Sequence, residues 1–84
     1  MSVKKIVALK YPEGAPAPFI SVSARGALAE RLLKVAAEHG VPVVENGMLT
    51  DFLTLQEIGS YVPEETWDVL AGIFAFVMKT NARL

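Results

Sequence analysis

A proline-rich segment near the N-terminus most constrains what this chain can fold into. Residues 12–18 contain three prolines and a glycine. Because proline fixes φ and lacks an N–H group, such a segment can continue neither a helix nor a central sheet ladder. Short runs of β-branched and apolar residues flank it, at Val3–Tyr11 and Phe19–Val22. The sequence therefore predicts a strand, a loop and a second strand.

A helix is predicted next, with Ser23 as its N-cap, an end near His39 and Gly40 in the left-handed position that closes many helices. One broad apolar arc is expected to face a sheet; it consists of Leu28, Ala29, Leu32, Leu33, Val35, Ala36 and His39. The short apolar run Pro42–Glu45 follows after a tight turn. This order predicts a third strand, with the helix as a parallel crossover.

The C-terminal half is predicted to hold two helices. After an Asn46-Gly47 turn, a short helix is expected over Met48–Leu55, with Leu49, Phe52, Leu53 and Leu55 facing inward. Residues 57–62 form a connector, and Pro63 followed by two glutamates marks the start of a last helix, which ends near Thr80. This helix is apolar around most of its circumference. It is either sandwiched in the core, the alternative we favour, or presents an apolar patch to another protein.

These elements predict an α/β fold in which a small mixed central β-sheet of about 3–4 strands is surrounded by three to four α-helices. With 84 residues, the chain has room for one domain, residues 1–84. It contains no cysteine, so a disulfide cannot stabilise it.

Composition argues against several classes of function. A formal net charge of -1 lacks the basic excess that holds nucleic acid. With no cysteine and one histidine, no metal site is expected, and the scattered glycines form no phosphate-binding pattern. His39 is expected to cap helix carbonyls, and Glu64 and Glu65 to favour a helix start. We therefore expect no cofactor, no catalytic residue and no enzymatic activity.

The sequence shows neither a secretory signal nor an apolar run long enough to span a membrane. The longest uncharged apolar run, Val69–Met78, has ten residues, about half of the roughly 20 that a spanning helix needs. A cytoplasmic protein that does not insert directly into the membrane is expected.

The charged residues are segregated along the chain. No lysine or arginine lies between Lys34 and Lys79, whereas that stretch holds seven acidic residues. Such polarity suits a basic or apolar protein partner, and an ordinary solvated surface is the alternative.

Five short motifs, in this order and spacing, resemble one protein family: Val7–Tyr11, Ala24–Ala27, Val41–Asn46, Glu57–Gly59 and Val62–Glu65. Together they resemble the cytoplasmic C-terminal domain of the FlhB/YscU family of type III secretion export components. The resemblance covers residues from about Ile6 to Met78. It implies a small central sheet surrounded by helices. In family members this domain follows four transmembrane helices, lies beneath the export gate and helps to select export substrates.

The family's Asn-Pro-Thr-His self-cleavage motif has no counterpart here. The resemblance places it at Met1, Ser2, Val3 and Lys4, and none of these residues matches. Because there is no asparagine to cyclise, we expect no self-cleavage. We expect a stand-alone form without the membrane portion and without the linker helix and strand that precede the motif in the family.

A second departure lies where the family has Asn-Pro-Pro-Leu followed by Ala-Arg. This chain has Asn46-Gly-Met-Leu49 and then Thr50-Asp51, so an acidic residue stands at a basic position. That change implies either a different set of partners or a carboxylate that only solvates a short helix. The expected partner-binding residues are Met48, Leu49, Asp51 and Phe52, together with the loop Pro12–Pro18. The alternative for Leu49 and Phe52 is a place in the core.

The resemblance implies a non-catalytic accessory component of flagellar or type III protein export that acts through protein–protein binding. The alternative is a soluble regulatory decoy that competes with full-length FlhB. The implied partners are the membrane-embedded FlhB-like component, export substrates and chaperones. The implied location is the cytoplasm, including the periphery of the inner-membrane export gate.

Overall fold

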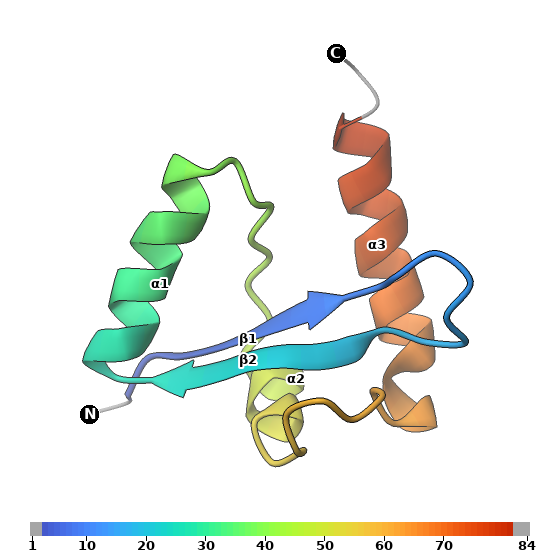
Figure 1. Cartoon of the computed structure of the whole chain (residues 1–84), viewed down its shortest axis with the longest axis horizontal. Coiled ribbons are helices and arrows are strands. Elements are labelled where there is room, and N and C mark those ends of the chain that lie inside the picture. The colour runs from blue at the N-terminus through green and yellow to red at the C-terminus, as the bar shows by residue number, and fades with distance from the viewer. Residues whose placement is uncertain (1–2, 82–84) are drawn as a thin grey trace.

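The computed structural model describes residues 3–81, in which a two-stranded sheet runs between two helices (Figure 1). Strands β1 (Lys5–Lys10) and β2 (Phe19–Arg25) pair antiparallel, and helices α1 (Ala27–Glu38) and α3 (Trp67–Asn81) lie toward opposite ends of the sheet. Helix α2 (Gly47–Leu53) packs against β1, and a 3-10 turn, η1 (Glu64–Thr66), leads into α3. The α/β class is confirmed, in a flat molecule of 35 × 31 × 19 Å.

The proline-rich segment forms the predicted loop between the strands. The register places Lys10 opposite Phe19 and Lys5 opposite Arg25, with an irregularity between Ala8 and Leu9. The Ala15 N–H donates to the Pro12 carbonyl over 3.0 Å, which closes a turn inside the loop. The loop ends in the buried residues 17 and 18, so it is anchored in the core on the side of β2.

The predicted connector 57–62 lies along the outer edge of β2. The Ile20 N–H donates to the Ser60 carbonyl over 3.0 Å, and the Gly59 N–H donates to the Ile20 carbonyl over 2.7 Å. Tyr61 makes a single antiparallel bridge to Phe19. Gly59 has φ 93°, which favours glycine at this position. The connector therefore covers part of an edge that would otherwise be open.

The predicted third strand does not form. Among residues 3–81 the sheet has two strands, so the expected 3–4 strands and the parallel crossover are corrected. The Val41 N–H donates to the Ala36 carbonyl, and Pro42 has no N–H group. The first two residues of this segment therefore have no free donor for pairing with a strand. Within the described chain, residues 43–45 donate no backbone hydrogen bond. Val41, Val43 and Val44 are all exposed.

This correction gives a direct test. We expect Val43→Thr to change the free energy of unfolding by less than about 0.5 kcal/mol, because Val43 is 54% exposed. The same change at buried Val62 places a hydroxyl in the core and is expected to cost about 1–3 kcal/mol. Urea denaturation measures both values. Equal destabilisation by the two changes would show that residue 43 is buried as in a central strand.

Helix α1 begins later than predicted. Ser23 is not its N-cap, because β2 continues to Arg25 and Ser23 pairs with Val7. Gly26, with φ 68°, turns the chain, and its N–H donates to the Lys4 carbonyl over 2.7 Å. The predicted end is confirmed, with Gly40 at φ 69°. His39 Nδ1 lies 2.9 Å from the Val35 carbonyl oxygen, in the predicted capping role.

The predicted apolar arc of α1 is only partly buried. Ala29 is buried and Leu32, Leu33 and Ala36 are intermediate, whereas Leu28, Val35 and His39 are exposed. The helix contacts the paired strands but has no further layer beyond it, so a broad arc cannot be covered.

The core lies where the proline-rich loop, β2, α2, the connector and α3 meet. Its buried members are Ala17, Ile20, Leu53, Val62 and Leu70, against which Val7, Leu9, Leu49, Ile73 and Phe74 pack. At the start of α3, the buried Thr66 hydroxyl donates to the Pro63 carbonyl over 2.7 Å. This bond leaves no unpaired hydroxyl in the core.

Helix α3 is not sandwiched in the core, and it leaves large apolar side chains exposed, which corrects the alternative that we favour from the sequence. Leu70 faces the core, whereas Trp67, Val69, Phe76 and Met78 are exposed. Figure 1 shows the helix at one side of the molecule, with the other elements on one side of it only.

Candidate protein-binding site

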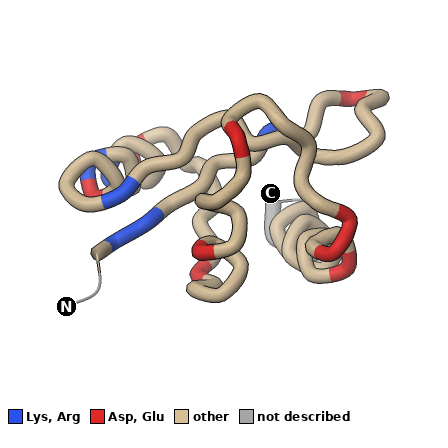
Figure 2. Tube along the Cα trace, turned by 90° about the horizontal axis from the view of Figure 1, so that it is seen from below, with Lys and Arg blue, Asp and Glu red and all other residues tan. Residues whose placement is uncertain are grey.

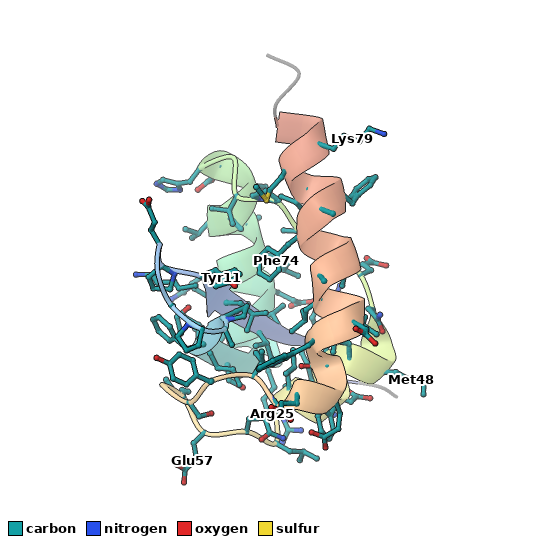
Figure 3. The ribbon with its side chains drawn as sticks, turned by 90° about the vertical axis from the view of Figure 1, so that its right-hand side faces the viewer. Tyr11, Arg25, Met48, Glu57, Phe74 and Lys79 are labelled. Carbon is teal, nitrogen blue, oxygen red and sulfur yellow. The ribbon has the colours of Figure 1, made fainter. Side chains whose placement is uncertain are left out.

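Helix α2 carries the four predicted contact residues, and the structure separates them into two pairs. Leu49 packs against the core and Phe52 is partly buried. Met48 is 88% exposed and projects away from the body of the molecule (Figure 3). Asp51 is also exposed. The exposed pair is available for contact, whereas the other pair contributes mainly to packing.

Hydrogen bonds at both ends hold α2 in place. The Asn46 side-chain oxygen accepts from the Leu49 N–H over 3.1 Å, so Asn46 is the N-cap and not only a turn residue. After the last turn, the Thr54 hydroxyl donates to the Asp51 carbonyl over 2.7 Å. Leu55 lies beyond the helix end and is 79% exposed, which corrects its predicted inward position.

An ion pair joins α2 to β1. Lys5 Nζ donates to a carboxylate oxygen of Asp51 over 3.2 Å. Because the Asp51 side chain is largely exposed, this pair contributes at most about 1 kcal/mol to stability. In this arrangement the Asp51 carboxylate lies on the sheet side of α2, next to Lys5.

An open depression of about 480 Å³ surrounds this ion pair. Strand residues line one side and α2 with its following turn lines the other; the lining residues are Lys5, Ser23, Ala24, Arg25, Asp51, Thr54 and Leu55. Figure 2 shows basic residues at this end of the sheet, both basic and acidic residues on α1, and acidic residues on α2 and at the start of α3. The depression therefore has two cations on its strand side and one carboxylate on its α2 side.

The sequence analysis assigns neither Lys5 nor Arg25 to a binding site, and it predicts Ser23 as a helix N-cap. They belong to strands, and the site forms only because the hairpin register sets Lys5 opposite Arg25. The basic character of the residues outside 35–78 was the available signal, but it did not indicate which of them meet Asp51.

A second hollow, of about 550 Å³, lies between the proline-rich loop and α3. The rings of Tyr11 and Phe74 contact each other here, with centroids 5.8 Å apart. Residues 12–15 and Met78 complete its lining. Only the first part of the predicted loop surface is open, since residues 17 and 18 are buried.

Two of the four positions matched to the cleavage motif can be placed. Val3 and Lys4 are exposed, and the Lys4 carbonyl is bonded to Gly26. Met1 and Ser2 lie outside the described residues.

Residues 3–81 contain no group of three or more His, Cys, Asp or Glu side chains that could hold a metal ion. None of the helices in that range is long and apolar enough to cross a membrane.

Solved structures share this fold. The C-terminal domain of PscU matches with a TM-score of 0.81 and 24% identity, over 87% of this chain and 95% of that one. The mutated H265A EscU C-terminal domain matches with a TM-score of 0.84 and 23% identity, over 89% and 93%.

Curated relatives extend the comparison to sequence. Flagellar biosynthetic protein FlhB of Bacillus subtilis (strain 168) is 44% identical over 80 residues, which is 93% of this chain and 22% of FlhB. The chain thus spans about a fifth of that relative. Uncharacterized protein YlqH of the same organism is 31% identical over 80 residues, which is 94% of this chain and 86% of YlqH.

The model of the FlhB HrpN YscU SpaS family matches residues 4–77, nearly all of the chain that folds into the hairpin and its helices. The motifs that suggested this resemblance lie along the same stretch. This chain therefore belongs to the FlhB HrpN YscU SpaS family.

Proposed function

We propose that this chain is a stand-alone FlhB-like cytoplasmic domain that serves as a non-catalytic accessory component of flagellar or type III protein export. It acts by binding other proteins. The proposed partners are the membrane-embedded FlhB-like component, export substrates and their chaperones. The match to YlqH over most of that relative's length supports a form of this size.

The observation that carries the proposal is the set of large apolar side chains on α2 and α3 that the fold leaves exposed. Met48, Trp67, Val69 and Met78 are among them. Large apolar side chains that a fold leaves exposed are candidates for burial against another protein. Both helices are held by the core, so these side chains are presented on a rigid scaffold.

The lack of self-cleavage is part of the proposal. None of the residues matched to the cleavage motif, Met1, Ser2, Val3 and Lys4, is an asparagine, whereas a peptide bond broken by asparagine cyclisation needs one. Incubation of the purified chain followed by intact-mass spectrometry tests this point. We expect a single unchanged mass, and a specific cut near the amino end would contradict it.

A pull-down from membranes tests binding. We expect the tagged chain to retain the membrane-embedded FlhB-like component, identified by mass spectrometry, and a deletion strain to show reduced secretion or motility. Recovery of no export component, together with normal secretion and motility in the deletion strain, would contradict the proposal.

The alternative function is a regulatory decoy. It is supported by the 44% identity to a curated FlhB, since similar surfaces compete for the same ligands. Overexpression separates the two roles. A decoy lowers secretion in a wild-type strain, whereas an accessory component leaves it unchanged or rescues a partial defect.

A further inference from the structure

We propose that the depression between the sheet and α2 binds carboxylate groups of an acidic segment in a partner protein. Arg25 is the main cation, Lys5 assists it and Asp51 limits the affinity. The inference deepens the proposed function by naming the chemistry of the partner.

The charges of the hairpin carry the first step of the argument. Lys5 and Arg25 are directly opposite in the antiparallel register, and both line the depression. Like charges at opposed positions of a sheet repel each other, so a nearby anion stabilises the pair. Asp51 neutralises Lys5 only. Among the described side chains, no carboxylate lies within ion-pair distance of the Arg25 guanidinium.

The shape and lining of the depression favour a carboxylate side chain as the anion. A guanidinium binds a carboxylate through two parallel N–H···O bonds. The Ser23 hydroxyl also lines the depression, and the described chain offers it no hydrogen-bond partner. Leu55 adds an exposed apolar side chain to the same lining. A segment that alternates acidic and apolar residues therefore matches this surface.

Nucleic acid fits the same surface less well. The formal net charge of the chain is -1, and Asp51 lies within the depression itself. A polyanion held mainly by its phosphates needs a broad basic surface, which α2 and the start of α3 interrupt with acidic residues.

Substitution of Asp51 is expected to raise the affinity for an acidic ligand, in contrast to substitution of Arg25. Its carboxylate holds Lys5 but also repels an incoming carboxylate at short range. Asp51→Asn removes that repulsion and releases Lys5 for the ligand. Misfolding lowers affinity, so tighter binding by this variant could not be a result of misfolding.

The probe is a capped peptide, acetyl-Glu-Leu-Asp-Glu-Leu-Asp-amide, titrated into the 15N-labelled chain at low ionic strength and followed by the amide resonances. We expect the largest shifts at residues 23–25 and 51–55. Arg25→Gln should weaken binding about tenfold, since hydrogen bonds between charged groups are the strong ones. Asp51→Asn should tighten it several-fold, and Lys34→Gln, which removes an exposed cation of α1, should change it less than twofold.

Three results would overturn the inference. One is equal binding of the matched peptide with Gln and Asn in place of Glu and Asp. Another is unchanged affinity in Arg25→Gln or weaker affinity in Asp51→Asn. The third is tighter binding of a single-stranded DNA oligonucleotide than of the acidic peptide. If the chain still retains an export component in any of these cases, the proposed function stands and only this site is wrong.

Discussion

Replacing Leu70 with aspartate is expected to unfold the domain. Leu70 is 4% exposed and belongs to the cluster that joins α3 to β2 and α2. Loss of a buried leucine side chain costs about 2–5 kcal/mol, and a carboxylate left in its place adds several kcal/mol of desolvation. A domain of this size has only about 4–13 kcal/mol of stability. Far-ultraviolet circular dichroism should show loss of helix at 25 °C and neutral pH.

The neighbouring residue supplies the control. Val69 is 48% exposed, so Val69→Asp should leave a folded protein with a change of less than about 1 kcal/mol. The two substitutions introduce the same charge one position apart. A folded Leu70→Asp variant, or two variants that unfold alike, would contradict the orientation of α3 described above.

A second large effect is expected at the end of α2. Leu53 is 3% exposed, and Leu53→Ala should lower the free energy of unfolding by about 2–5 kcal/mol, because it leaves a cavity in the cluster. Leu55→Ala removes the same atoms from an exposed position and should cost less than about 0.5 kcal/mol.

Urea titrations of both variants measure this difference. The sequence pattern predicts that both leucines face inward, whereas only Leu53 is buried in the structure. The difference between the two costs therefore shows which description is correct. Costs above about 2 kcal/mol for both would place Leu55 in the core and extend α2 beyond Leu53.

Local signals predicted much of the fold. Proline ended both the strand before residue 12 and the connector before η1, and Gly40 ended α1, because these residues act through their own backbone. Gly26 precedes α1, and the prediction of Ser23 as the cap is wrong because β2 continues to Arg25. A hydroxyl residue is common at helix starts, yet it also suits an exposed strand position.

Hydrophobic periodicity predicts burial wrongly where burial depends on how many other helices and strands pack against a segment. The pattern of one segment does not contain that information. Val43 and Val44 have the β-branched composition of a strand, but within residues 3–81 no backbone hydrogen bond pairs them with another strand. Leu28 and Val35 belong to the predicted apolar arc of α1, yet both are exposed. In a flat chain with one small core, each helix is covered on a single side, so broad arcs remain partly exposed.

The candidate site was only partly predictable. Met48 and Asp51 could be named because they follow a helix start and differ from the family pattern. Lys5 and Arg25 lie 20 residues apart, and only the hairpin register brings them to the same place as Asp51. That register depends on the irregularity after Ala8, which no local signal indicated.

We propose that export proteins contact this chain on the exposed side of α2, where Met48 lies. Site-specific photocrosslinking in living cells tests it most directly, with the photoreactive residue at position 48 and, as the control, at position 31 on α1. Both positions are exposed. We predict that position 48 gives an adduct with an export component, identified by mass spectrometry, and that position 31 does not. Adducts of equal yield at both positions, or none with an export component from position 48, would contradict the claim.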